Sequence, residues 1–191
     1  MHIGVLALQG AVEEHVKAIQ AVGAQAVLVK QRADLSKLDG LLLPGGESTA
    51  IRQLMDYHDL LEPLQAFAKS KPVFGTCAGL ILLADTVEGQ TSHIGAMRIT
   101  AKRNAFGRQV DSFEAKLAIQ YVSDAFPAVF IRAPKIVAVQ EDVEILATYK
   151  QEIVCARDRH LLACSFHPEV TGDLSLMQYF VQMIQEHQSQ I

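Results

Sequence analysis

Short apolar runs alternate with helically spaced apolar positions along the first half of the chain. Residues 3–8 form the first run, which predicts a buried strand that ends at Gln9-Gly10. The apolar positions that follow recur three or four residues apart and stop at a glycine, which predicts a helix: Val12, Val16, Ile19, Val22 and Gly23. The runs 26–29 and 40–43 predict two further strands.

Glycine and proline bound the elements that follow. A turn at Pro44-Gly45-Gly46 precedes a helix that begins near Ser48 or Thr49, and either hydroxyl is a suitable N-cap. Residues 71–75 predict a strand, and a helix follows at once from Ala78. Strands that alternate with helices predict an α/β fold, built as a mostly parallel open sheet with helices on both faces.

The second half of the chain has a different pattern. Between about residues 94 and 164, β-rich segments follow one another with few helical patterns: 96–101, 112–121, 128–131, 135–139, 144–149, 152–156 and 161–166. These segments predict antiparallel strands that extend or flank the parallel core. A last helix is predicted at about 174–186. With no internal repeat or linker, residues 1–191 are expected to form a single domain.

Composition and charge exclude several classes of protein. Hydrophobic residues make up 50% of the chain and charged residues 20%, which is typical of globular proteins. The net charge of −4 disfavours a nucleic-acid partner. No apolar run reaches the roughly 18 residues of a membrane helix. The N-terminus has no basic leader, so we expect no signal peptide and no membrane partner.

The cysteines indicate neither a disulfide framework nor a metal site. There are three, Cys77, Cys155 and Cys164, and they lie far apart in the sequence. No pair has the close Cys/His spacing of structural zinc. Cys155 and Cys164 lie in apolar runs, which indicates buried core thiols. We expect reduced thiols in a cytoplasmic protein.

The strongest chemical signal is the sequence Gly75-Thr76-Cys77-Ala78-Gly79, between a predicted strand and a predicted helix. This is the nucleophile-elbow pattern with cysteine in place of serine. The sharp turn strains the backbone of the nucleophile, and the two glycines let strand and helix approach closely. The helix N-terminus then favours the thiolate form of Cys77. The alternative is a buried, inert cysteine at a glycine corner, because short patterns recur by chance.

A second signal follows the strand predicted at 161–166. His167 lies at the carboxyl end of that strand, where ligands bind in open α/β sheets. Pro168 favours extended backbone before a turn, and Glu169 is close enough to orient the ring of His167. A histidine before a proline is alternatively a plain loop residue. Together with Cys77, however, the pair completes a nucleophile, a base and an orienting acid.

Two further stretches are weaker signals. The backbone amides of Gly45 and Gly46 are suited to hold an oxyanion, although a simple capped glycine turn explains the same residues. The spaced glycines and lysine of a phosphate loop are absent from this turn. Residues 102–114 and Arg132 fit solvent-exposed charges. Five scattered histidines are given no role: His15, His58, His93, His160 and His187.

Together these stretches resemble the class I, triad-type glutamine amidotransferases, and more narrowly the glutaminase subunits of pyridoxal 5′-phosphate synthase. The resemblance covers nearly the whole chain, with the motifs at residues 4–10, 43–49, 74–79, 103–114, 130–134 and 165–169. It implies a class I glutamine amidotransferase fold and a catalytic triad of Cys77, His167 and Glu169. It also implies a set of residues that bind L-glutamine: Gly46, Glu47, Ser48, Arg103, Ile131 and Arg132.

The resemblance also implies a reaction and a partner. Cys77 attacks the side-chain amide of glutamine, amides near Gly46 and Ala78 hold the oxyanion, and no metal or organic cofactor is required. Ammonia passes to the barrel subunit of pyridoxal 5′-phosphate synthase in a hetero-oligomer. Because 191 residues leave no room for a synthase domain, we expect that partner to gate activity. A peptide flip at Gly45-Gly46, sensed by Gln9, is the expected gate.

Three other functions remain open from the sequence. The chain could serve another synthase, such as imidazole glycerol phosphate synthase, as its glutaminase subunit. It could be a non-catalytic regulatory subunit, although an intact Cys77, His167 and Glu169 argues against this. It could also be a cysteine hydrolase or redox sensor on a similar fold.

Overall fold

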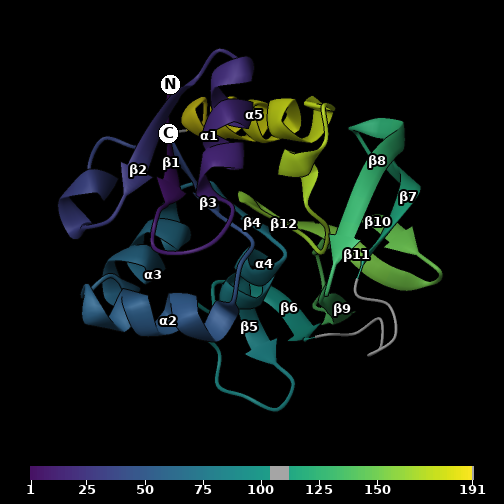
Figure 1. The fold of residues 1–191 in the computed structure, drawn as a ribbon, viewed down its shortest axis with the longest axis horizontal. Coiled ribbons are helices and arrows are strands. Elements are labelled where there is room, and N and C mark those ends of the chain that lie inside the picture. The colour runs from purple at the N-terminus through teal and green to yellow at the C-terminus, as the bar shows by residue number, and fades with distance from the viewer. Residues whose placement is uncertain (104–111, 191) are drawn as a thin grey trace.

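The computed structural model describes residues 1–103 and 112–190, and a ten-stranded sheet runs through the centre of that part (Figure 1). The strand order is β2-β1-β3-β4-β12-β11-β9-β6-β5, with β10 paired to β11. Five of these strands are parallel neighbours: β2 (Gln25–Val29), β1 (His2–Leu6), β3 (Gly40–Leu43), β4 (Val73–Thr76) and β12 (Leu161–Cys164). The predicted α/β class and mostly parallel core are confirmed.

The sheet continues beyond β12 with strands from the second half of the chain. They are β11 (Glu152–Asp158), β10 (Glu144–Tyr149), β9 (Lys135–Val139), β6 (Met97–Lys102) and β5 (Ala84–Val87). The pairs β12–β11, β11–β10, β11–β9 and β9–β6 are antiparallel, as predicted for this half. β7 (Ser112–Ile119) and β8 (Ser123–Ile131) form a separate antiparallel pair.

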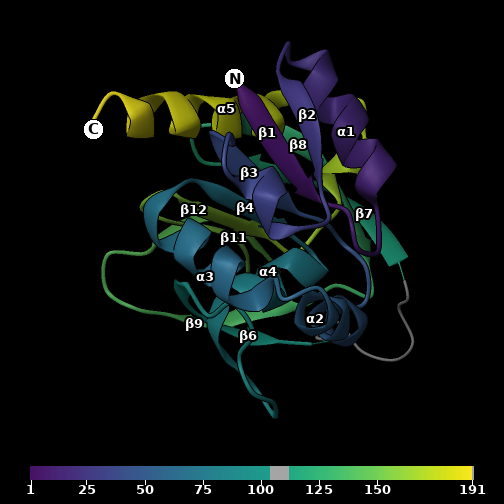
Figure 2. The same cartoon turned by 90° about the vertical axis from the view of Figure 1, so that its left-hand side faces the viewer.

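Helices cover both faces of the sheet (Figure 2). One face carries α2 (Ser48–Tyr57), α3 (Leu61–Ser70) and α4 (Ala78–Leu83), whose apolar side chains share one core cluster. The other face carries α1 (Val12–Ala21), α5 (Ser175–Gln188) and the β7–β8 pair, which share a second cluster. Along β12, Leu161 and Ala163 belong to the first cluster and Leu162 and Cys164 to the second, because successive residues of a strand point to opposite faces. None of the helices in residues 1–103 and 112–190 has the length and apolarity to span a bilayer.

Three elements differ from the sequence prediction. β12 was grouped with the antiparallel segments, but it pairs in parallel with β4. Neither α3 nor β5 was predicted. β5 follows α4 in the chain without a break. The apolar composition of residues 78–87 therefore does not by itself show where the helix ends and the strand begins.

The N-cap of α2 also differs from the predicted one. Neither Ser48 nor Thr49 caps the helix. The carboxylate of Glu47 accepts hydrogen bonds from the backbone N–H groups of Thr49 and Ala50, at 3.1 and 2.8 Å. Glu47 has the longer side chain and reaches two amides at once, whereas Ser48 is buried one position inside the helix.

Candidate active site

Cys77 occupies a strained turn between β4 and α4. Its backbone angles are φ 50° and ψ −105°, in a region that non-glycine residues rarely adopt. A Cβ on Gly75 would collide with the backbone of Gly79, and a Cβ on Gly79 would collide with the backbone of Leu43. These two glycines therefore allow the close approach of strand and helix that places Cys77 at the start of α4.

The parallel pairing of β4 with β12 brings the next segment beside Cys77. Thr76 is opposite Cys164 in the register, and the Cys77 N–H donates to the Cys164 carbonyl at 2.9 Å. Three residues later, the N–H of His167 donates to the carbonyl of Val129 on β8 at 2.8 Å. Strand pairing on one side and β8 on the other thus hold the backbone of His167.

His167 and Glu169 form a buried pair. Nδ1 of His167 lies 2.7 Å from Oε1 of Glu169, and the two residues are 8% and 9% exposed. Residues Pro168–Val170 form a short 3-10 turn that returns the carboxylate to the ring. The orienting contact predicted for this pair is present in the structure.

The environment sets the charge of both groups. Burial by itself lowers the pKa of His167, but the interactions with Cys77 and Glu169 outweigh burial and raise the pKa to about 10. Burial raises the pKa of Glu169, but its hydrogen bond to His167 and the nearby His15 lower it overall. An imidazolium facing a carboxylate is therefore the favoured form of the pair near neutral pH.

The thiol of Cys77 lies between the histidine and the end of β8. Its Sγ is 3.8 Å from the carbonyl oxygen of Ile131, which accepts a weak hydrogen bond. Gly45 packs against both His167 and Cys77, and a Cβ on Gly45 would collide with the imidazole. The glycine turn therefore lies directly against the Cys77 side chain and the His167 imidazole.

The turn at Gly45-Gly46 is bound on its far side by the β1–α1 loop. The Gly45 carbonyl accepts from the Ala11 N–H at 3.0 Å, and the Glu47 N–H donates to Oε1 of Gln9 at 2.9 Å. Gln9 also contacts Gly46 closely enough that a Cβ there would lie 2.5 Å from Oε1. The Gln9 side chain thus reaches the turn that the sequence singled out for an oxyanion.

Arg103 reaches the same region from the end of β6. Its guanidinium is 2.8 Å from Oε1 of Glu47, 3.1 Å from the hydroxyl of Thr49 and 3.2 Å from Oε1 of Gln90. Burial raises the pKa of Glu47, but the backbone N–H groups of Thr49 and Ala50 and the charge of Arg103 lower it overall. Arg103 remains partly exposed, as expected for a charge in this stretch, and its side chain lines the same pocket as Cys77 and His167.

A pocket of about 420 Å³ opens at this point. It is lined by Gln9, Gly46, Glu47, Ser48, Cys77, Ala78, Ile81, Arg103, Ile131, Arg132, Pro134 and His167. Every residue that the resemblance implied for glutamine binding is in this set. Gly45 and Glu169 do not line the pocket themselves but contact His167, which does. Of the polar stretch 102–114, residues 104–111 lie outside the described part of the chain.

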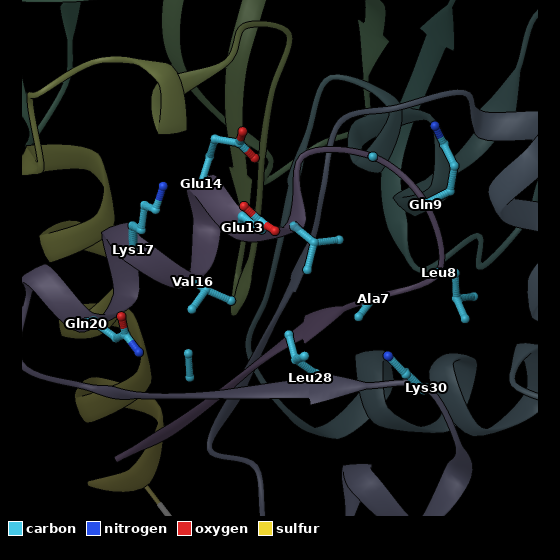
Figure 3. Close-up of a pocket in the computed structure, with 13 residues that line it drawn as sticks. Ala7, Leu8, Gln9, Glu13, Glu14, Val16, Lys17, Gln20, Leu28 and Lys30 are labelled. Carbon is cyan, nitrogen blue, oxygen red and sulfur yellow. The ribbon is translucent and has the colours of Figure 1, made fainter.

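The structure also has a larger hollow of about 710 Å³, whose lining residues are drawn in Figure 3. Gln9, on the loop between β1 and α1, lines both this hollow and the smaller pocket. Glu13, Glu14, Lys17 and Gln20 project from α1 along the hollow, opposite Leu28 of β2 (Figure 3). The residues that line the hollow include no Cys, Ser, Thr or His, whereas Cys77 and His167 both line the smaller pocket.

Sequence reasoning missed three residues near the site. Ile81 and Pro134 line the pocket. His15 is fully buried on α1, with Nε2 3.1 Å from the Thr76 hydroxyl and 3.7 Å from Oε2 of Glu169. A polar residue on the core-facing side of an amphipathic helix was the available signal for His15.

The remaining cysteines and metal-ligating groups take no part in this pocket. Cys155 and Cys164 are fully buried and opposite each other on β11 and β12. Burial raises the pKa of Cys155 to about 12 and that of Cys164 well above its usual value. No group of three or more His, Cys, Asp or Glu side chains suited to a metal ion occurs within residues 1–103 and 112–190.

Known proteins match the chain over nearly its full length. The model of the SNO glutamine amidotransferase family matches residues 5–186. The chain is similar to the pyridoxal 5′-phosphate synthase subunit PdxT of Geobacillus thermodenitrificans, with 59% identity over 188 residues, 97% of this chain and 96% of that protein. The subunit of the same name from Anoxybacillus flavithermus is 56% identical over 186 residues, 96% of this chain and 97% of that protein. A solved structure described as a glutamine amidotransferase superposes with a TM-score of 0.91 at 40% identity, covering 96% of this chain and 98% of that one.

Proposed function

Because the chain belongs to the SNO glutamine amidotransferase family, we propose that it hydrolyses L-glutamine to L-glutamate and ammonia as the glutaminase subunit of a pyridoxal 5′-phosphate synthase. The observation that supports this most directly is the placement of three groups. Cys77 and His167 line the pocket of about 420 Å³, and Glu169 lies behind His167 at 2.7 Å. A nucleophile, a base and an orienting acid in this arrangement suit acyl transfer.

The proposed reaction proceeds through a thioester. The proton of Cys77 resides on His167 as the imidazolium, and the thiolate attacks the side-chain amide carbon of glutamine. His167 then protonates the leaving nitrogen, ammonia departs, and a γ-glutamyl thioester remains on Cys77. Water, deprotonated by His167, hydrolyses the thioester to glutamate and restores the thiol. Glu169 holds the ring and stabilises the imidazolium at each step.

The oxyanion is assigned to backbone amides at Gly46 and Ala78. Both residues line the pocket beside Cys77, and Ala78 is the first residue of α4. The N-terminus of a helix favours negative charge, so an amide there suits a developing oxyanion. Gly45 shapes this wall from behind, where it packs against Cys77 and His167.

The amino-acid end of glutamine is assigned to the opposite side of the pocket. Arg103 offers a cation to the α-carboxylate, and Glu47 offers an anion to the α-ammonium group. These two side chains already pair at 2.8 Å, so both charges face the same space. Ser48, Ile131 and Arg132 complete the walls of the proposed glutamine site.

The partner is the synthase barrel subunit, which receives the ammonia in a hetero-oligomer. The relatives at 59% and 56% identity are both named as subunits of pyridoxal 5′-phosphate synthase. Residues 1–191 act as one glutaminase domain in this proposal, and the cytoplasm is the proposed compartment. Three unpaired, buried thiols suit a reducing compartment.

Gating by the partner is part of the proposal. Gln9 bonds to Glu47 and lines both the pocket and the larger hollow, so it is placed to report on a protein bound beside α1. Its contact with Gly46 gives it access to the oxyanion amide. Flipping the Gly45-Gly46 peptide would require the Ala11–Gly45 hydrogen bond to break.

The test is glutamine hydrolysis by the purified chain, alone and with the pyridoxal 5′-phosphate synthase barrel subunit. We expect slow hydrolysis alone and stimulation by the partner. The synthase subunit of imidazole glycerol phosphate synthase serves as the control partner and should not stimulate. Stimulation by the control partner alone would assign the chain to another synthase, and no hydrolysis with either would favour a regulatory subunit.

A further inference from the structure

His15 connects α1 to the triad from the side opposite the substrate. It lies on α1 and is fully buried, and it does not line the pocket of about 420 Å³. Its Nε2 faces two oxygens, the Thr76 hydroxyl at 3.1 Å and Oε2 of Glu169 at 3.7 Å. Thr76 directly precedes Cys77, and Glu169 orients His167. His15 therefore touches both halves of the reactive centre without contacting the substrate space.

The second oxygen of Glu169 needs such a neighbour. Oε1 is bound to His167, whereas Oε2 is buried and has no hydrogen-bond partner among the described residues. A buried carboxylate oxygen without a donor nearby is costly, so the closest N–H matters. His15 is 3.7 Å from that oxygen, close enough for electrostatic stabilisation though longer than a hydrogen bond.

The protonation state of His15 follows from its surroundings. Burial lowers the pKa of His15, and the charge of His167 lowers it further, while Glu169 and Glu14 raise it; the net pKa is below the usual value. His15 is thus a neutral imidazole with one N–H. The Nε2–H tautomer directs this hydrogen toward the Thr76 and Glu169 oxygens, which both face Nε2, and no described residue bonds to Nδ1.

We infer that His15 is a positioning residue of the triad, whose Nε2–H faces Oε2 of Glu169 at 3.7 Å and so favours the ionised carboxylate that orients His167. The inference rests on the proposed glutaminase function and adds a fourth member to its Cys77-His167-Glu169 chain. His15 exchanges no proton with the substrate. It stabilises the carboxylate, and the carboxylate stabilises the imidazolium that forms when Cys77 loses its proton.

The first experiment compares His15→Leu with wild type in the complete complex with the synthase subunit. We expect kcat to fall about ten-fold, a loss of ~1.4 kcal/mol of transition-state stabilisation. KM for glutamine should stay within about two-fold, because His15 makes no ground-state contact with the substrate. Without the facing N–H the carboxylate form of Glu169 is less stable, so the acid limb of the kcat/KM profile should move to higher pH.

The other titratable residues around Glu169 are the same in wild type and in His15→Leu. Glu14 acts on His15 from the same helix, and Asp173 lines a cavity of about 10 Å³ together with His15 and Glu169. His167 and Cys77 lie on the substrate side. None of these is altered by the substitution, so a shift in the acid limb reports the loss of His15.

Further variants distinguish the loss of the N–H group at the Nε2 position from a general loss of stability. His15→Gln places an amide N–H near the former Nε2 and should recover most of the kcat, whereas the shorter His15→Asn should not. Ile19→Val is the matched control, since Ile19 is fully buried on the same helix and belongs to the core cluster. It should lower the urea midpoint without moving the pH profile. If His15→Leu does not fold, the Gln and Asn pair decides.

A second measurement does not depend on glutamine hydrolysis. Iodoacetamide alkylation of Cys77 reports its nucleophilicity, and its pH dependence should shift upward in His15→Leu but not in Ile19→Val. If wild type does not hydrolyse glutamine, the proposed function fails and alkylation still tests His15. Wild-type kcat and an unchanged alkylation profile in His15→Leu would overturn the inference, as would equal shifts in Ile19→Val.

Discussion

Nδ1 of His167 lies 2.7 Å from Oε1 of Glu169, which follows it by two positions in the chain. A 3-10 turn at Pro168–Val170 closes this contact, and both side chains are nearly buried. The orientation of the proposed base is therefore set locally, by the turn that follows it. Its partner Cys77 lies 90 residues earlier (167 − 77), directly after β4, which pairs in parallel with β12.

Replacing Glu169 should be milder than replacing the nucleophile. Glu169→Gln keeps an oxygen able to accept from the ring but loses the charge that stabilises the imidazolium. We expect kcat to fall roughly one to two orders of magnitude less than in Cys77→Ala, since loss of an orienting acid costs less than loss of the attacking group. His167→Asn should be as severe as Cys77→Ala. Steady-state glutaminase assays with the synthase subunit measure all three, and a Glu169→Gln loss equal to that of Cys77→Ala would contradict the assigned role.

The choice of nucleophile is tested among the cysteines. Cys77→Ala and Cys77→Ser should abolish glutamine hydrolysis while leaving the fold and the binding of the synthase intact. Cys155→Ala and Cys164→Ala should retain activity but unfold at a lower denaturant concentration, because both thiols are fully buried and their loss leaves a cavity. Substantial activity in Cys77→Ala, or an equal loss in either core variant, would show that the wrong residue was assigned.

The raised pKa of His167 predicts a pH-dependent stability. The pKa rises from 6.5 to about 10 in the folded protein, so the contribution of the imidazolium is complete below pH 6.5 and is lost as the pH rises through about 10. We expect the difference in unfolding free energy between wild type and His167→Asn to shrink by ~1 kcal/mol or more between these limits. Urea titrations at both pH values measure it. A difference that stays constant would mean that the pKa of His167 is not raised.

Substitution of Arg103 should affect substrate binding more than chemistry. We expect Arg103→Ala to raise KM for glutamine roughly ten- to a hundred-fold, because a hydrogen bond to a charged group contributes about 1.5–3 kcal/mol. The kcat should change much less, since the contact is equally present in ground and transition states. Arg52→Ala is the control: Arg52 pairs with Asp56 on α2 and does not line the pocket. Equal KM values for the two variants would remove Arg103 from the glutamine site.

One experiment tests both whether the synthase subunit stimulates hydrolysis and whether Gln9 is required for that stimulation. Gln9→Ala removes the acceptor for the Glu47 N–H and should weaken stimulation by the synthase. In this proposal Gln9 helps to hold the backbone amide that stabilises the oxyanion. Loss of one such donor typically lowers the rate roughly 10²–10³-fold. The rates of wild type and Gln9→Ala, each alone and with the synthase, provide the test. A wild-type chain that is fully active alone would rule out gating, whereas normal stimulation of Gln9→Ala would leave gating but exclude Gln9.

The sequence by itself determined the local features of this protein. Strand and helix alternation, the Gly75–Gly79 elbow and the His167-Pro168-Glu169 turn all depend on residues a few positions apart. Periodicity and turn chemistry report such local geometry directly. The parallel core with helices on both faces follows from the same pattern, because alternating strands and helices have few ways to pack. The strained φ of Cys77 likewise follows from its position in the sharp turn between the close-packed Gly75 and Gly79.

Tertiary structure alone decided which distant residues meet. Arg103 lies 56 positions from Glu47, Gln9 lies 38 positions from Glu47, and His15 lies 61 positions from Thr76. Sheet order and strand register determine these encounters, and no local pattern encodes either. His15 is the clearest case, since along the sequence it is one of several scattered histidines. Burial on α1 against the 3-10 turn of Glu169 is what places it beside that carboxylate.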